Sequence, residues 1–154
     1  MEWVTANSQG RHRYERKNGK DYVVVPMSLL VPGVLNGSRG ALYYPEEEVF
    51  KNVSAWDGMP IVVYHPTQNG RNISARTPEV AFKSKIGRIY NTGRGEKNNL
   101  TAEGWINIQD VSRVDRRVLD MIRAGKPIEL STGLYTQNEP APKGAVDGKG
   151  RQYQ

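Results

Sequence analysis

Two side chains of this 154-residue sequence could together carry out acyl transfer: an imidazole at position 65 and a hydroxyl at position 131. A hydroxyl nucleophile needs a base within hydrogen-bond reach, and near neutral pH histidine is the usual base. The sequence has two histidines, His12 and His65, and no cysteine. Because His12 lies in a polar N-terminal run, His65 is the candidate base.

His65 ends the apolar run 61–65, which is typical of a buried strand, and Pro66 stops that strand. A loop held by a rigid strand end is a common place for a functional side chain. The alternative is that His65 caps its strand or bonds a loop carbonyl, and residue type alone favours that alternative.

Ser131 lies in the segment 128–135, which alternates between apolar and other residues as a half-buried strand does. Period two places Ser131 on the face opposite the apolar side chains, together with Glu129 and Gly133. Gly133 leaves room for a substrate to approach closely, as an acyl-transfer site requires. The alternative is an ordinary polar residue on an exposed face. Since His65 is distant in sequence, only the tertiary structure can pair it with Ser131.

The composition excludes several other kinds of site. Without cysteine there are no disulfides, thiolate zinc sites, iron–sulfur ligands or cysteine nucleophiles, and two histidines are too few for a histidine-rich metal site. The acidic run 46–48 suits a helix start and has no metal-ligand pattern. The segment 92–97 lacks the Gly-Lys-Ser/Thr ending of a phosphate loop. We therefore expect no metal and no cofactor.

Charge and polarity divide the chain into an arm and a domain. Lys and Arg number 22 against 16 Asp and Glu, giving a net charge of +6 that would allow weak binding to nucleic acid or an acidic partner. Residues 1–20 have few apolar groups and are expected to form a flexible basic arm, in which Trp3 and Tyr14 would suit nucleic-acid contact. A solvated tail is the commoner meaning of such a run. Residues 21–154 are expected to form one domain, cytosolic because no apolar run has the length of a signal peptide or membrane span.

The pattern of the domain predicts a mainly β fold with few helices, since 16 Gly and 9 Pro argue for many turns. Strands are expected over 22–31, 61–65, 86–90, 100–108 and 128–135, with a hairpin connection over 91–99 and a loop over 67–80. Pro26 indicates an edge position or a bulge. Helices are expected over 45–52 and over 110–124, the second with Asp110 as its N-cap and Gly125 at its end.

Six short motifs follow one another along the chain. They are Trp-Asp-Gly-Met-Pro (56–60), Val-Tyr-His-Pro (63–66), Ser-Ala-Arg-Thr-Pro-Glu-Val (74–80), Ile-Gly-Arg-Ile-Tyr-Asn (86–91), Ala-Glu-Gly-Trp-Ile (102–106) and Glu-Leu-Ser-Thr-Gly-Leu-Tyr (129–135). Their order resembles the tailed-phage prohead (capsid maturation) serine proteases, in the branch known as a conserved phage domain of unknown function. The resemblance spans residues 21–150, and the series is far more specific than any single motif.

The resemblance implies a fold similar to the herpesvirus assemblins, with an antiparallel, barrel-like β core and a few peripheral helices. It implies that His65 is the general base and that Ser131, rather than Thr132, is the nucleophile. Attack by Ser131 on a peptide carbonyl, with proton transfer to His65, would then give an acyl-enzyme that water resolves.

The sequence departs from the family at its C-terminal end. Related chains continue past the Gly-rich segment into a stretch with an Asp-His pair, whose His resembles the orienting third member of a Ser-His-His site. This chain ends at Gln154, before that stretch, so we expect a C-terminally truncated chain whose third catalytic residue lies beyond it. Asp147 and Glu129 are substitutes only in principle. Without the orienter the base would lack a defined tautomer and position.

The sequence therefore predicts a serine endopeptidase that processes phage scaffold and capsid proteins inside the assembling procapsid, in the host cytoplasm, with self-cleavage as a further option. No membrane partner is expected, and nucleic acid is not expected as the main partner. Two alternatives remain open. One is a non-catalytic capsid-assembly or scaffold module with the same fold, and the other is a small basic nucleic-acid-binding domain.

Overall fold

The computed structural model describes the backbone of residues 2–8, 11–126, 128–134 and 137–154, and the side chains of 11–126, 128 and 137–154. The strands are β1 (Glu2–Ser8), β2 (Arg13–Lys17), β3 (Lys20–Leu30), β4 (Gly33–Gly37), β5 (Gly40–Tyr44), β6 (Pro60–Val62), β7 (Thr67–Gln68), β8 (Arg71–Asn72), β9 (Lys85–Arg94), β10 (Leu100–Asn107) and β11 (Glu129–Leu134). The helices are α1 (Glu46–Val49), the 3-10 turn η1 (Val53–Trp56), α2 (Pro78–Ser84) and α3 (Ile108–Arg123). The expected mainly β fold with a few helices is confirmed.

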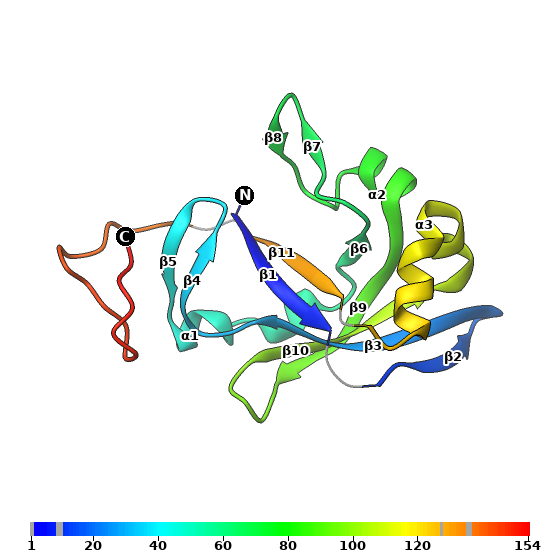
Figure 1. Cartoon of the computed structure of the whole chain (residues 1–154), viewed down its shortest axis with the longest axis horizontal. Coiled ribbons are helices and arrows are strands. Elements are labelled where there is room, and N and C mark those ends of the chain that lie inside the picture. Colours follow the sequence, from blue (N-terminus) through cyan, green and yellow to red (C-terminus); the bar gives the residue numbers. More distant parts are fainter. Residues whose placement is uncertain (1, 9–10, 127, 135–136) are drawn as a thin grey trace.

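Seven strands form one antiparallel sheet in the order β11-β1-β3-β10-β9-β6, with β2 also paired to β3. Two small hairpins, β4–β5 and β7–β8, stand apart from it. In Figure 1, β3 and β10 run along the base of the view, and two arms rise from the same side of them. One arm is β1 with β11, and the other is β9 with β6 (Figure 1).

The N-terminal residues differ from the expectation of a flexible arm. Residues 2–8 and 13–17 are strands of the main sheet, and the boundary expected at residue 21 falls inside β3. The turn that joins β2 to β3 is Asn18-Gly19, with both residues at positive φ, which is the commonest sequence of a tight hairpin turn. All five residues of β2 are exposed. This strand is therefore held by backbone pairing to β3 without burying any of its side chains.

Pro26 lies in the interior of β3 but at a place where one side of that strand has no paired neighbour among the described residues. The pairing with β2 ends at Val24, and the pairing with β1 begins at Met27. Pro26 pairs with Glu103 of β10 on the other side. The missing backbone N–H therefore falls in a gap between two partner strands, which agrees with the expected local edge.

The hydrophobic core fills the concave side of the sheet and is covered by α3. It comprises the buried side chains of Val23, Val25, Met27, Leu29, Leu30, Tyr44, Val49, Ile61, Val63, Ile86, Ile89, Leu100, Ala102, Ile106, Val111, Leu119 and Ile122. Of these residues, Val111, Leu119 and Ile122 lie on α3 and form its buried stripe. Gly104 adds no side chain to this layer, and a Cβ built there would lie 2.8 Å from the Met27 sulfur and 3.2 Å from Ile61 Cδ1.

Two helical predictions need correction. The N-cap of α3 is Asn107, whose side chain accepts a hydrogen bond from the Asp110 N–H at 3.0 Å, so Asp110 lies in the first turn. The helix expected over 45–52 is shorter than predicted, because α1 ends at Val49, and the separate 3-10 turn η1 begins only after Asn52. Helix α2 forms in the segment expected to be a loop, with Pro78 in its first turn, where a missing N–H costs nothing.

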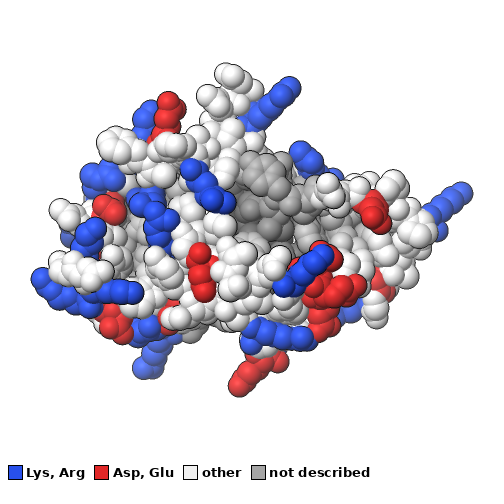
Figure 2. Space-filling view, turned by 180° about the vertical axis from the view of Figure 1, so that it is seen from behind, with Lys and Arg blue, Asp and Glu red and all other residues white. Residues whose placement is uncertain are grey.

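Charged side chains are unevenly distributed over the surface. In the view of Figure 2, Lys and Arg outnumber Asp and Glu over the half that carries α3 and the β2–β3 hairpin in Figure 1. No helix in the described part of the chain is long and apolar enough to cross a membrane.

Replacing Gly87 by alanine tests the close approach of β9 to β10. Gly87 pairs with Ile106, and a Cβ at this position would collide with the backbone carbonyl of Trp105. We expect Gly87→Ala to lower the free energy of unfolding by about 1–3 kcal/mol in urea denaturation, as overpacking does. Gly93 lies on the same strand with open space around it, so Gly93→Ala is the matched control. Equal stabilities of the two variants would contradict the close approach.

Candidate active site

His65 lies in the loop that follows β6, and its side chain is exposed. The strand expected to run through His65 ends earlier, at Val62. The reason is the conformation of Tyr64, whose φ of 68° is in the left-handed region. A non-glycine residue there costs about 1–3 kcal/mol and persists only when the surrounding structure holds it. Such strain often occurs beside functional groups, and here it directs the chain at the residue before His65.

The strained Tyr64 is held by two residues of α3. Its hydroxyl donates a hydrogen bond to Asp115 Oδ2 at 2.9 Å and accepts one from Arg117 Nη2 at 3.1 Å. Arg117 also donates from Nη2 to Asp115 Oδ2 at 2.8 Å and from Nε to Asp115 Oδ1 at 3.0 Å. These three side chains form a closed ring of hydrogen bonds, which we call the Tyr64 clasp. It fixes the β6 loop to α3.

Asp115 serves the clasp because it also interrupts α3. Its φ of −160° and ψ of 98° are not helical, so the helix consists of two segments that meet at this residue. Its Oδ1 accepts from the Arg117 N–H at 3.0 Å, which is the arrangement of an N-cap for the second segment. Hydrogen bonds from the side chains of Arg117 and Tyr64 hold the pKa of the Asp115 carboxyl well below its ordinary value. The carboxylate is therefore ionised at any physiological pH.

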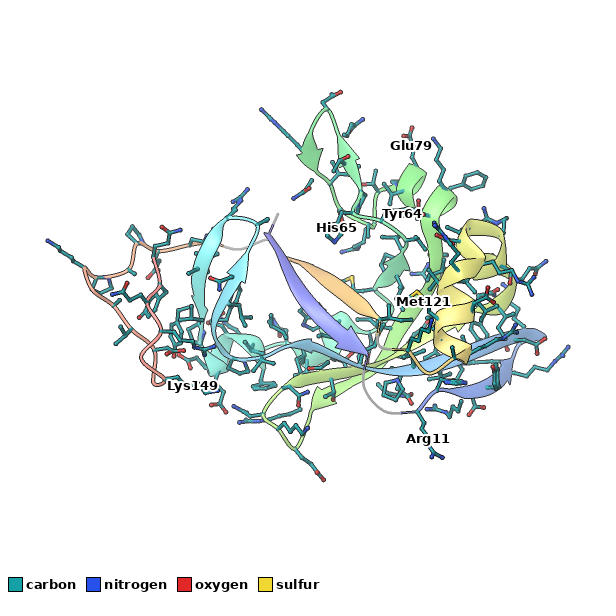
Figure 3. The ribbon with its side chains drawn as sticks, in the orientation of Figure 1. Arg11, Tyr64, His65, Glu79, Met121 and Lys149 are labelled. Atoms are coloured by element: carbon teal, nitrogen blue, oxygen red, sulfur yellow. The ribbon has the colours of Figure 1, made fainter. Side chains whose placement is uncertain are left out.

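Figure 3 shows how the two consecutive residues diverge. Tyr64 lies on the α3 side of the loop, as its hydrogen bonds require, and His65 lies on the other side. In this view that other side is the one on which β1 and β11 rise. The clasp thus holds Tyr64 against α3 and directs His65 away from that helix.

Ser131 lies in β11, where its backbone pairs with Thr5 of β1. The side chains of β11 are outside the described residues. The predictions that depend on them, which are the alternation of the two faces and the choice of Ser131 over Thr132, fall outside the described residues as well. In sheet order β11 and β6 are the two end strands. His65 follows one end strand and Ser131 belongs to the other, so strand pairing does not by itself bring the two residues together.

Asp147, one of the two substitutes considered for the orienting residue, is engaged elsewhere. Its carboxylate pairs with Arg151 at 2.6 Å and accepts hydrogen bonds from backbone N–H groups, among them that of Lys149 at 2.9 Å. Burial raises the pKa of Asp147, but hydrogen bonds from Arg151, Lys149 and Val34 lower it to about 2. This carboxylate fixes the C-terminal segment to the β4–β5 hairpin. The side chain of the other substitute, Glu129, is outside the described residues.

Sequence reasoning missed the three residues of the clasp. Tyr64 precedes the candidate base in the Val-Tyr-His-Pro motif, but nothing in its type predicts a positive φ. Asp115 and Arg117 fall within the expected helix 110–124, where they suit an exposed face. In the part of the chain that the structure describes, no three His, Asp or Glu residues form a group that could hold a metal ion.

Replacing Tyr64 by phenylalanine removes the hydroxyl from the clasp and keeps the ring. We expect amide hydrogen exchange at Val63, whose N–H bonds Ser84 O at 3.1 Å, to become roughly two- to tenfold faster as the loop opens more often. Tyr90→Phe, on an exposed tyrosine of β9, is the control and should leave that rate unchanged. Unaltered exchange in Tyr64→Phe would show that the hydroxyl does not restrain the loop.

The clasp also predicts a dependence of stability on pH. The pKa of Asp115 is lower in the folded protein than its ordinary 3.8, so the charged form adds stability above that value. This contribution should fade as the pH falls below about 4. We expect wild type to melt above Asp115→Asn at pH 7 and this difference to shrink between pH 4 and pH 2, measured by circular dichroism. A difference that stays constant over this range would contradict the assignment.

Comparisons with protein-family models, with curated proteins and with solved structures returned no match. The expected resemblance to the prohead proteases therefore depends on the series of motifs in the sequence alone.

Proposed function

We propose that this chain is a serine endopeptidase of phage procapsid maturation, with a barrel-like core of the assemblin type. Its substrates are the scaffold protein and the propeptide of the capsid protein, with self-cleavage as a further reaction. It acts within the assembling procapsid in the host cytoplasm. The motif series supports the family, and the setting of His65 supports the chemistry.

The observation that carries this proposal is the position of His65 beside a strained, clasped residue. An ordinary strand cap would need neither the positive φ of Tyr64 nor the three-residue clasp to α3. Among the described non-glycine residues with positive φ, Tyr64 is the only one that is not an asparagine, and the exposed imidazole is next to it. A catalytic base must be accessible to substrate and must also be held in one position. Exposure of His65 suits the first requirement, and the clasp on its neighbour suits the second.

In the proposed reaction Ser131 Oγ attacks the carbonyl carbon of the scissile peptide bond while His65 takes the hydroxyl proton. The new C–O bond gives a tetrahedral oxyanion, which backbone N–H groups would stabilise. Collapse breaks the C–N bond, and His65 gives its proton to the leaving amine. Water then attacks the acyl-enzyme, with His65 again as base, and releases the acid product and the free serine.

Processing in cells tests the assignment of both residues. We expect Ser131→Ala and His65→Gln, introduced separately into the coding sequence, to slow cleavage of co-expressed scaffold and capsid proteins by about 10³-fold or more. Thr132→Val is the matched control, because it removes the neighbouring hydroxyl of the same strand and should leave cleavage intact. Circular dichroism verifies that each variant folds. Undiminished processing by Ser131→Ala would rule out the protease.

A serine-reactive fluorophosphonate probe separates the enzyme from a non-catalytic assembly module with the same fold. The probe should label wild type on Ser131, and labelling should disappear in Ser131→Ala and weaken in His65→Gln. Labelling that survives in Ser131→Ala would place the reactive hydroxyl elsewhere.

A further inference from the structure

The sheet has a second face, on its convex side, that the core does not use. Helix α3 packs its apolar stripe against the concave side, and the opposite side of β2, β3, β10 and β9 carries the exposed side chains of Arg13, Lys17, Arg88 and Tyr90, although Val24 on that side is fully buried. Register places one row of side chains from these four strands on this outer face. The row contains Arg13, Glu15, Lys17, Lys20, Tyr22, Val24, Glu103, Trp105, Arg88 and Tyr90.

Trp105 is the centre of this outer face, with a tyrosine on each neighbouring strand. The ring of Tyr22 on β3 lies 5.6 Å from that of Trp105, and the ring of Tyr90 on β9 lies 6.4 Å from it, both edge to face. Tyr90 is 39% exposed. Three aromatic rings on three adjacent strands thus form a continuous band across the sheet.

Cations surround the aromatic band. The Arg13 guanidinium lies 5.9 Å from the Trp105 ring centre and the Lys17 ammonium 5.7 Å from it. The carboxylate nearest the band, Glu103, is neutralised by Arg13 at 2.5 Å and also accepts a hydrogen bond from Asn91. Four cations stand on this face against two carboxylates, and three of them, Lys17, Lys20 and Arg88, form no ion pair among the described residues.

We propose that this outer face binds single-stranded nucleic acid. Bases would stack first on Tyr90, the exposed ring of the band, with the partly buried rings of Trp105 and Tyr22 beside it, and phosphates would contact Lys17, Lys20 and Arg88. A four-stranded antiparallel sheet that presents aromatic rings from adjacent strands is a general platform for unpaired bases, and stacking on it tolerates any sequence.

The aromatic band favours nucleic acid over an acidic peptide. Carboxylates of a peptide would be satisfied by the lysines alone, and they would leave the row of rings unused. Nucleic acid matches both features, because its bases present flat π faces and its phosphates present a regular row of charges. The face does not overlap the candidate active site, since Tyr64 and His65 lie beyond β6, outside the four strands that form it.

Fluorescence anisotropy of the full chain with a fluorescein-labelled oligothymidylate of about 15 nucleotides tests the proposal. We expect binding that weakens as salt rises from about 50 to about 200 mM, with a slope of log affinity against log salt near −2, from roughly three phosphate contacts. Tyr90→Ala should weaken binding about tenfold through lost stacking. The double variant Lys17→Ala/Lys20→Ala should make the slope shallower by about 1.4.

Matched variants make the result specific to this face. Tyr14 lies on the same hairpin but on the opposite face of β2, so Tyr14→Ala should not alter the affinity. The exposed Lys143 and Lys149 lie in the C-terminal segment, outside these strands, and replacing both with alanine should leave the slope nearly unchanged. Absence of binding, a salt-independent affinity, equal losses in Tyr14→Ala and Tyr90→Ala, or tighter binding of a polyglutamate peptide would each overturn the proposal.

Discussion

The antiparallel pairing of β3 with β10 is the interaction on which the rest of the structure depends. Along this ladder Val23 pairs with Ile106, Val25 with Gly104, and Met27 with Ala102, and the side chains of these residues other than Gly104 form the floor of the core. Every other strand of the sheet joins one of these two, directly or through a neighbour. Loss of this pairing would therefore detach both arms at once, whereas loss of an end strand would remove only that strand.

The same ladder separates the molecule into two chemically different surfaces. Because side chains alternate along a strand, apolar residues of β10 point to the concave side while Glu103 and Trp105 point to the convex side. The concave side binds α3, and α3 in turn holds the β6 loop through Asp115. On the convex side Tyr90 and the cations lie at the surface, while Tyr22 and Trp105 are partly buried. Two proposed activities can thus occupy one small domain because they use opposite faces.

Sequence patterns predicted the parts whose signal is local. The strand expected over 100–108 and the helix expected over 110–124 correspond to β10 and α3, because burial on one face imposes a regular spacing of apolar residues on each. The strands of residues 2–17 were missed, since an edge strand can form with exposed side chains through backbone bonds alone. The clasp was missed for another reason: it depends on where α3 breaks and on the left-handed Tyr64, which are set by tertiary contacts. The residue type and position of His65 identified it as a candidate base, but the sequence could not predict the Tyr64 clasp that restrains its loop.

Curvature of the sheet connects the fold to the proposed chemistry. Ile61 belongs to β6, two strands away from β10, yet its Cδ1 would lie only 3.2 Å from a Cβ on Gly104. In a flat sheet strands two apart are separated by about 10 Å, so β6 must bend over the concave side. The right-handed twist of each strand pair adds in the same sense across the sheet, by roughly 20–25° per step. Because Gly104 and Ala102 are small, they leave space above the middle of β10, and β6 can bend over it without a steric clash. The curved sheet thereby turns the loop of His65 toward the concave side. In the proposed reaction, Ser131 of the opposite end strand would have to approach His65 on that side.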